Sequence, residues 1–229
     1  MIDFIVPARS GSKRLPNKNI KLLRSKPLIF YTIEALLDHK HINNVIFTSD
    51  SEEYCSLVRN EFGTDVKLIH RPEVTAGDKV KVVDEVERLL KSESHLFHSD
   101  FFGMTLPTAP LRNWNTVDNL LQRWDINKAS YFSASKYSFP IQFGFDIDQN
   151  GNWIPLIEES PMVTGNTRSQ DIKTYYRPNG AIYIKRISDF LEKKILYHQA
   201  LPHIISEVEA MDVDTELDFL MIEQILNSK

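Results

Sequence analysis

Short strand-like runs alternate with helical patterns over the first 135 residues, and this alternation constrains the fold more than any other feature. The strand-like runs are 2–7, 44–49, 66–70, 101–105 and 130–135, and the helical patterns between them are 28–39, 51–61, 80–92 and 114–125. In the third helical pattern, Val80, Val83, Val86 and Leu90 recur on one face. Such alternation favours parallel strands joined by right-handed crossovers. We therefore expect an α/β fold with a Rossmann-like, mostly parallel sheet flanked by helices.

The alternation stops after residue 135. Residues 139–176 contain two β-like pieces around Asp148–Gly151, where an Asn-Gly pair is typical of a hairpin turn. A strand-like run then covers 180–184, and helical patterns cover 187–194 and 215–227. The sequence predicts a single domain over residues 1–229 with a small inserted β-hairpin lobe at 139–176.

The inserted lobe carries apolar residues that we expect to be exposed. They are Phe143, Phe145, Trp153 and Ile154. Exposed apolar side chains in a small insertion favour a dimer contact, so we expect a homodimer formed through this lobe. The alternative is a lobe that packs against its own domain.

Composition excludes several classes of partner. The chain has 27 Lys and Arg against 31 Asp and Glu, a formal charge of −4, so we expect neither nucleic acid nor an anionic membrane as a partner. Cys55 is the single cysteine, so no disulfide within one chain is possible, as in a reducing cytosol. The sequence shows no signal-peptide pattern and no apolar run of about 18 residues. These features predict a soluble cytoplasmic protein.

The loop after the first predicted strand concentrates positive charge. Four cations, Arg9, Lys13, Arg14 and Lys18, fall within ten positions, around Gly11-Ser12. Ligands of parallel α/β sheets bind beyond the carboxyl ends of the strands, where this loop begins. Backbone N–H groups and cations on such a loop suit phosphate. The loop has neither the Walker A nor the GxGxxG spacing, so it predicts a triphosphate site of another kind. The alternative is a solvated basic loop.

Asp212 and Asp214 form the second candidate site. Their spacing points both carboxylates the same way in an extended segment, and hard oxygen ligands suit Mg²⁺. The alternative is an exposed acidic turn before the last helix. Nearby Thr215 and Asp218 have the spacing of a capping box, and Asp50 fits a helix N-cap, so we leave both aspartates out of the metal set. The histidines show no spacing typical of a zinc site.

Four motifs together resemble the CMP-sialic acid synthetases, the acylneuraminate cytidylyltransferases. They are ARSGSKRLPNKNI at 8–20, PTAPLR at 107–112, YRPNGAIYI at 176–184 and DVDTELDF at 212–219. The resemblance spans nearly the whole chain. It implies transfer of CMP from CTP to the anomeric hydroxyl of a nine-carbon 2-keto acid sugar, with release of pyrophosphate. It also implies Mg²⁺ and a homodimer.

The resemblance further implies roles for individual residues. The matching nucleotide-binding positions are Arg9, Gly11, Ser12, Lys13, Lys18, Asn19 and Arg71. Asp212 and Asp214 match the metal-binding aspartates, and we expect Asp214 to be the more important of the two. Arg9 and Lys13 would stabilise charge on the triphosphate and on the leaving pyrophosphate, so with Asp214 they form the catalytic set. The acceptor would be bound by Gln142, Arg168 and Arg177. No residue stands out as the general base.

The sequence departs from the family pattern around the base and the acceptor. Leu106 stands where the family commonly has Gln, and Gln142 stands where sialic-acid-specific members tend to have Lys. Lys79 and Lys81 replace small hydroxyl residues. These changes affect acceptor identity and the base pocket, whereas the triphosphate and metal motifs match.

Three functions are therefore compared. The leading one is a CTP-dependent cytidylyltransferase for a nonulosonic acid such as N-acetylneuraminic, legionaminic or pseudaminic acid. The second is a nucleotidyltransferase of the same fold with another acceptor, such as an octulosonate or a sugar phosphate. The third is a nucleotide-binding protein without turnover, for which the two lysines at 79 and 81 are the only support.

Overall fold

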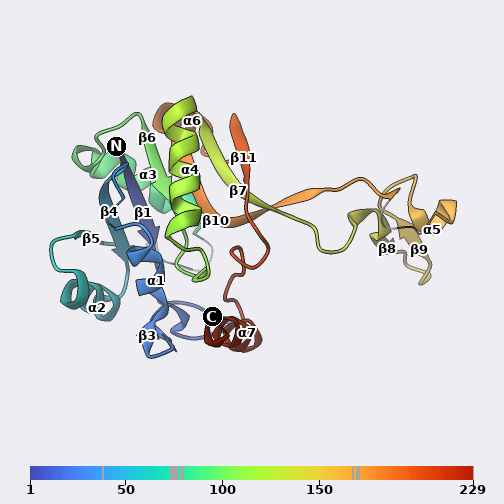
Figure 1. Cartoon of the computed structure of the whole chain (residues 1–229), viewed down its shortest axis with the longest axis horizontal. Helices are drawn as coiled ribbons and strands as arrows, with labels where there is room; N and C mark the ends of the chain where they lie inside the picture. Colours follow the sequence, from blue (N-terminus) through green and yellow to red (C-terminus); the bar gives the residue numbers. More distant parts are fainter. Residues whose placement is uncertain (38, 73–76, 78–79, 167, 169–170, 229) are drawn as a thin grey trace.

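A seven-stranded sheet forms the centre of this computed structural model, which describes residues 1–229 except 38, 73–76, 78–79, 167, 169–170 and 229 (Figure 1). In sheet order the strands are β11 (Ala200–Ile204), β7 (Ser130–Lys136), β10 (Tyr176–Arg186), β6 (Phe101–Met104), β1 (Ile2–Pro7), β4 (Ile42–Ser49) and β5 (Val66–His70). β1 pairs in parallel with β4 and β6, β4 with β5, and β7 with β11. The mostly parallel sheet is confirmed, and β10 is the antiparallel exception, pairing with both β6 and β7.

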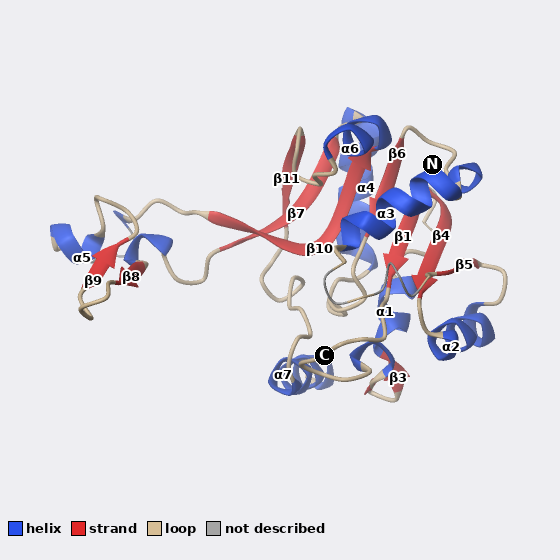
Figure 2. Ribbon diagram, turned by 180° about the vertical axis from the view of Figure 1, so that it is seen from behind, coloured by secondary structure: helices blue, strands red, loops and turns tan. Residues whose placement is uncertain are grey.

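Helices cover both faces of the sheet (Figure 2). They are α1 (Leu28–Glu34), α2 (Glu52–Phe62), α3 (Val82–Ser92), α4 (Trp114–Asn127), α6 (Ile187–Lys193) and α7 (Glu216–Asn227). The alternation of side chains along β1 explains the two layers. Phe4 and Val6 belong to the core cluster that includes α1, α2 and α4, whereas Ile5 belongs to the cluster that includes α3 and α6.

The C-terminal helix α7 does not cover a face of the sheet; it packs beyond the carboxyl end of β1 (Figure 1). Its Phe219 and Ile222 join a third core cluster with Leu15 of the basic loop and Leu28 of α1. Two short strands, β2 (Leu22–Leu23) and β3 (Lys26–Pro27), form a small hairpin beside it. This cluster fixes one end of the basic loop against the end of the chain, nearly 200 residues later.

The predicted elements are present, but several bounds differ. α1 ends at Glu34 instead of continuing to 39, and α3 begins at Val82 instead of 80. β11 is missing from the prediction because Pro202 interrupts the strand pattern. The N–H of Ile205 donates to Ala134 of β7, so alternation puts the nitrogen of Pro202 on the outer side of this edge strand. Proline is tolerated there because no ladder hydrogen bond is lost.

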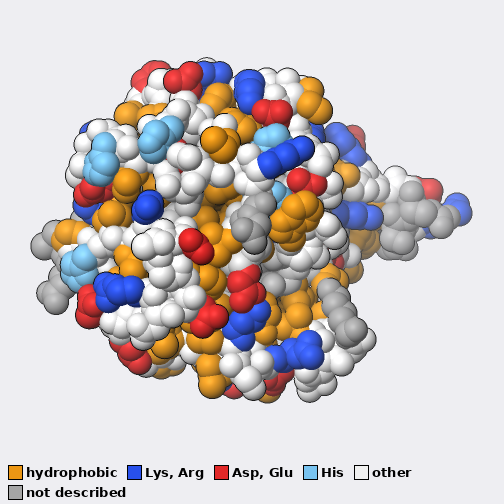
Figure 3. Space-filling view, turned by 60° about the vertical axis from the view of Figure 1, so that its left-hand side comes forward, with side chains coloured by type: hydrophobic (Ala, Val, Ile, Leu, Met, Phe, Trp, Pro, Cys, Tyr) orange, Lys and Arg blue, Asp and Glu red, His pale blue; other side chains and the backbone are white. Residues whose placement is uncertain are grey.

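The lobe stands apart from the sheet at the end of a two-stranded ribbon made by β7 and β10 (Figure 1). Within it, β8 (Phe145–Ile147) and β9 (Trp153–Pro155) pair as the predicted hairpin, followed by the short helix α5 (Pro161–Thr164). The exposed apolar side chains of the lobe include Phe145, Ile147, Trp153, Ile154 and Leu156, while Phe143 is half-buried. Figure 3 shows the lobe projecting from the body, on whose visible face basic and acidic side chains are interspersed.

No helix in the described part of the chain combines the length and the apolar character needed to cross a membrane.

Candidate active site

A cavity of about 690 Å³ lies where β1 and its parallel neighbours end. The basic loop after β1 forms one side, Arg71 after β5 and residues 106–108 after β6 form others, and the segment before α7 closes it. The predicted nucleotide-binding residues that line it are Arg9, Ser12, Lys13, Lys18, Asn19 and Arg71. Gly11 lies exposed on the loop and is not part of the lining. Gly11 does not adopt a positive φ; the residue of this loop that does is Asn17, at 54°.

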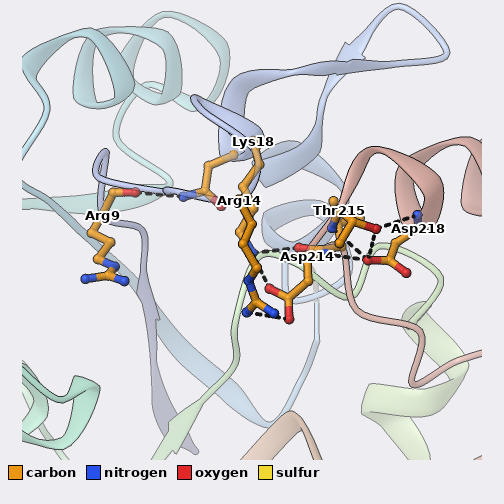
Figure 4. Close-up of polar contacts among 8 residues, drawn as sticks. Arg9, Arg14, Lys18, Asp214, Thr215 and Asp218 are labelled. Atoms are coloured by element: carbon orange, nitrogen blue, oxygen red, sulfur yellow. Dashed lines mark hydrogen bonds and ion pairs between the residues drawn. The ribbon is translucent and has the colours of Figure 1, made fainter. Parts of the chain in front are cut away.

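Internal hydrogen bonds hold the basic loop in place. Buried Asn19 donates from Nδ2 to the carbonyl oxygen of Arg9 (3.0 Å), which ties the two ends of the loop together (Figure 4). The N–H of Ser12 donates to the Ser10 carbonyl (2.8 Å). This N–H is therefore engaged inside the loop and is not part of the expected backbone nest in this structure.

Asp50 anchors the loop from the end of β4. It accepts from the N–H and from the hydroxyl of Ser10, both at 2.8 Å. The expected N-cap role of Asp50 is wrong, because the side chain of Ser51 accepts from Tyr54 N–H and caps α2 instead. The one-residue shift frees Asp50 to face the loop across the strand ends.

Arg71 enters the cavity from a buried position. Its N–H donates to Ser49, its side chain is 4% exposed, and its Nε lies 3.7 Å from the buried carboxylate of Glu85 on α3. Burial lowers the pKa of Arg71, and the negative charge of Glu85 opposes that shift. Thr48 and Arg88 also donate to Glu85, so the arginine is held from behind by a fixed acidic group.

The two aspartates of the DVD motif both line the cavity. Asp214 faces two cations: Arg14 Nη2 lies 2.8 Å from Oδ2, and Lys18 Nζ lies 3.0 Å from Oδ1 (Figure 4). Asp212 opens to solvent at the cavity wall, yet the protein around it desolvates the carboxyl and raises its pKa, while a hydrogen bond from Thr108 opposes the shift.

Asp218 holds Asp214 in place, as well as capping α7. Thr215 and Asp218 form the predicted capping box. The same Asp218 carboxylate also accepts from the N–H of Asp214 (3.1 Å) and of Thr215 (2.7 Å) (Figure 4). The predicted cap is confirmed, and it fixes the backbone that presents the candidate metal ligands.

Asp212 and Asp214 fit a magnesium ion as a two-carboxylate donor set. Mg²⁺ takes hard oxygen ligands and commonly keeps several waters or binds substrate phosphates, so a pair of carboxylates beside a cationic cavity is compatible with this ion. Within the described residues no group of three or more His, Cys, Asp or Glu side chains forms an all-protein metal site.

A second cavity of about 560 Å³ adjoins the first and shares Asp212 and Asp214 with it. Arg177 on β10 lines this second cavity. Neighbouring Asn179 bridges to β7, accepting from Ser133 Oγ and donating to Ser135 Oγ, where the β7–β10 register shifts. The carboxylates thus stand between a cationic cavity and one that contains the predicted acceptor residue Arg177.

Two other predicted acceptor residues lie in the lobe and do not line either of these cavities. Gln142 is buried, donates to the Lys173 carbonyl (2.7 Å) and holds the lobe fold together. Arg168 is exposed, with its Nε 3.7 Å from Asp171. One chain alone therefore does not bring them to the carboxylates.

The site residues predicted from the sequence leave out several parts of the cavity lining. Arg14 was counted among the four cations of the basic loop, and Leu106 among the departures from the family pattern, but neither was given a binding role. Both line the cavity, together with Thr108, Val80 and Val82. Lys81 precedes α3 and is not in the lining, and the departure at Lys79 falls outside the described residues.

Arg112 of the PTAPLR motif is buried and supports the cavity wall from behind. It donates to the Ala181 carbonyl (2.6 Å), to Thr32 Oγ1 (2.8 Å) and to the Leu106 carbonyl (3.2 Å). Burial lowers its pKa. These bonds connect β10 with the segment after β6, so this arginine fixes the position of residues that line the cavity.

Comparison with known proteins gives a consistent result. The model of the cytidylyltransferase family matches residues 4–207. CMP-N,N'-diacetyllegionaminic acid synthase of Legionella pneumophila is 29% identical over 97% of this chain and 94% of its own length. Pseudaminic acid cytidylyltransferase of Campylobacter jejuni is 29% identical over 95% and 94%. N-acylneuraminate cytidylyltransferase of Escherichia coli is 29% identical over 100% of this chain and 52% of its own length.

Solved structures confirm the fold class. CMP:2-keto-3-deoxy-manno-octonic acid synthetase complexed with CTP superposes with a TM-score of 0.69 at 18% identity, covering 100% of this chain and 99% of the other. 4-Diphosphocytidyl-2C-methyl-D-erythritol synthase of Anaerococcus prevotii gives 0.66 at 11% identity, covering 99% and 96%. At these identities the likeness concerns the arrangement of helices and strands.

Proposed function

The chain belongs to the cytidylyltransferase family and is a CTP-dependent nucleotidyltransferase, and from this premise we propose that it transfers CMP from CTP to the anomeric hydroxyl of a nonulosonic acid, releasing pyrophosphate. The observation that carries the proposal is the shared position of Asp212 and Asp214 between the cationic cavity and the cavity of Arg177. A reaction between two bound substrates requires such an arrangement, since the reacting atoms have to meet at the boundary of their sites.

The cationic cavity suits the triphosphate. Arg9, Lys13 and Lys18 present positive charge from the loop after β1, and Arg71 presents it from the end of β5. These groups would neutralise the phosphates and stabilise the charge that develops on the leaving pyrophosphate. The walls formed by Val80, Val82 and Leu106 give the same cavity an apolar surface for the nucleoside.

Asp212 and Asp214 would hold Mg²⁺, with Asp214 as the main ligand. The ion would supply charge neutralisation at the α-phosphate. The chain's own contribution is to fix the carboxylates, through the capping box of Thr215 and Asp218, and to orient the acceptor hydroxyl for in-line attack.

Arg177 is proposed to bind the carboxylate of the acceptor. Its guanidinium offers the forked donors that match a carboxylate, and it lies in the cavity next to the metal ligands. The names of the relatives favour a nonulosonic acid over an octulosonate, because legionaminic, sialic and pseudaminic acid enzymes match nearly the full chain at 29% identity. The octulosonate enzyme shares 18% identity, a likeness of fold.

We further propose that the protein is a cytoplasmic homodimer that contributes to cell-surface polysaccharide synthesis. The exposed Phe145, Trp153 and Ile154 of the projecting lobe support a contact with a second copy. A second copy is also the way in which the exposed Arg168 could reach an acceptor, whereas Gln142 is buried inside the lobe. Sedimentation at micromolar concentration tests this: a dimer is expected, and Trp153→Ser is expected to shift it toward the monomer.

Pyrophosphate release tests the reaction. Purified protein is supplied with CTP, Mg²⁺ and, in parallel, N-acetylneuraminic, legionaminic and pseudaminic acids and an octulosonate. We expect release with a nonulosonic acid and its loss in Lys13→Ala, with Lys26→Ala, a cation outside the cavity, as the matched control. Release with the octulosonate alone would support the second function. CTP binding without turnover on any acceptor would support the non-catalytic one.

A further inference from the structure

Both oxygens of the Asp214 carboxylate face a cation in this structure. Arg14 Nη2 approaches Oδ2 at 2.8 Å, and Lys18 Nζ approaches Oδ1 at 3.0 Å (Figure 4). These are the same two oxygens that would bind a divalent ion. A metal ion bound to Asp214 would therefore compete with these two side chains for the carboxylate oxygens.

The two cations are held very differently. The Lys18 side chain is 15% exposed, and its Nζ also donates to the Val213 carbonyl at 2.6 Å. The Arg14 side chain is 69% exposed, and among the described residues its recorded polar contact is the one with Asp214. Exposed ion pairs are weak because water competes for both partners. Arg14 is accordingly the more weakly held of the two partners.

We propose that Arg14 is a positioning residue that competes with the divalent cation for Asp214. In the nucleotide-free protein its guanidinium pairs with the carboxylate, and metal binding releases it into the cavity that it already lines. This inference rests on the proposed metal role of Asp214. The exchange forms and breaks no covalent bond and transfers no proton; it replaces one cationic partner of the carboxylate by another.

After the exchange, the released Arg14 side chain can bind the triphosphate. A divalent ion beside Asp214 repels a guanidinium at the same oxygen, whereas the triphosphate of CTP attracts it. The planar fork of arginine matches two phosphate oxygens, so Arg14 can turn from carboxylate to phosphate within one cavity. Metal and nucleotide binding are thereby coupled, because each favours the state in which Arg14 has left Asp214.

Mn²⁺ alone provides the probe, since its free concentration is measured by electron paramagnetic resonance without nucleotide or turnover. The full chain is compared as wild type, Arg14→Gln, Arg14→Lys and Lys21→Gln. Lys21 is the matched control, because it lies on the same segment but pairs with Glu216, at 2.5 Å, instead of with Asp214. Arg14→Gln is expected to bind Mn²⁺ about 1.5- to 5-fold more tightly than wild type, the range that a weak exposed ion pair gives. Arg14→Lys and Lys21→Gln are expected to stay near the wild-type value.

Three outcomes would overturn the inference. An Arg14→Gln protein that binds Mn²⁺ no more tightly than wild type shows that Arg14 does not compete. An equal gain in Mn²⁺ affinity in Lys21→Gln shows that the loss of any positive charge from this segment is enough, without the Arg14–Asp214 contact. Absence of Mn²⁺ binding in every variant removes the competition altogether. None of these outcomes decides the proposed reaction, which the pyrophosphate assay judges separately.

A second readout follows the released side chain. With Mg²⁺ present, Arg14→Gln is expected to bind CTP more weakly than wild type, although it binds Mn²⁺ more tightly. A higher affinity for the metal ion together with a lower affinity for CTP is the result that a side chain exchanged between the two ligands predicts. A fold defect would weaken both, and unchanged CTP affinity would contradict the second half of the exchange.

Discussion

Ser10 and Asp50 join the basic loop to the neighbouring strand through two hydrogen bonds, N–H to Oδ1 and Oγ–H to Oδ2, both 2.8 Å long. The residues are 40 positions apart and meet because β1 and β4 are parallel neighbours that end together. One carboxylate thereby fixes the point from which the loop's cations enter the cavity.

Asp50→Asn is expected to weaken CTP binding without unfolding the protein. The amide accepts with one oxygen where the carboxylate accepts with two, and a hydrogen bond to a charged group contributes about 1.5–3 kcal/mol. If the whole of one such bond is lost to binding, CTP affinity falls by about 10- to 150-fold, measured by calorimetry. Ser10→Ala removes only the hydroxyl bond and should have a smaller effect. Wild-type affinity in Asp50→Asn would show that the loop is held by other contacts.

Arg177→Gln is expected to raise KM for the acceptor acid by about 10- to 100-fold while leaving KM for CTP unchanged. The reason is the position of Arg177 in the second cavity, outside the lining of the first. Initial rates with each substrate varied in turn measure both constants. Arg168→Gln is the informative comparison, because an equal rise there would place the acceptor against the lobe.

Asp214→Asn is expected to reduce kcat/KM by at least about 100-fold and to abolish the response to Mg²⁺. Asp212→Asn should lose less, since we assign it the secondary role. Asp218→Asn tests the support of Asp214: it retains both candidate metal ligands but weakens the cap of α7, at a cost of about 1 kcal/mol in the free energy of unfolding, and the hydrogen bond that holds the Asp214 N–H. Full activity of Asp214→Asn with unchanged Mg²⁺ dependence would disprove the assignment.

Local patterns explain which parts of the fold were predictable. The bounds of β1 and β5 match the prediction because each is a short run that ends at turn-forming residues. β11 was missed because Pro202 is acceptable only on the outer side of an edge strand, a fact of sheet position that the sequence does not display. The prediction for β10 was too short, at 180–184, because its first residues are a strand only through their pairing with the end of β7. That pairing, too, is a fact of sheet position that the sequence does not display.

In the candidate site, too, the residues of local motifs were predictable and the contacts between distant segments were not. The basic loop and the two aspartates were predictable because each is a compact motif of suitable chemistry. The contact of Arg14 with Asp214 joins positions 200 residues apart, and only the folded chain brings them together. Asp50 was assigned to the nearest helix because local capping rules do not include the loop that β1 places beside it.

Gly103→Ala is expected to destabilise the sheet centre. A Cβ at Gly103 of β6 would lie 2.4 Å from ring carbons of Phe4 on β1, and that ring is fully buried. Overpacking of this kind costs about 1–3 kcal/mol, which lowers Tm by about 2–12 °C for a chain of this size. Calorimetry measures the shift. Adding Phe4→Leu should recover part of the loss, and an unchanged Tm in the single variant would show that the strands separate without strain.

His39 is expected to make the protein less stable in acid. The ring is buried and stacks on Trp114 with centroids 4.3 Å apart, and burial lowers its pKa below the ordinary value of 6.5, although Trp114 and Asp118 oppose the shift. The unfolded chain therefore binds the proton first as pH falls. The stability contributed by neutral His39 is complete above about pH 6.5 and is lost as pH falls toward and through the lowered folded pKa.

Urea unfolding of wild type and His39→Gln at pH 7.5 and 5.5 measures this effect. The variant should be less stable at pH 7.5, because it loses the stacked ring, yet its free energy of unfolding should fall less between the two pH values. One proton accounts for at most about 1.4 kcal/mol per pH unit. Part of the slope should remain, since burial lowers the pKa of His203 as well. His95→Gln, at an exposed position, is the control, and an equal flattening there would refute the assignment to His39.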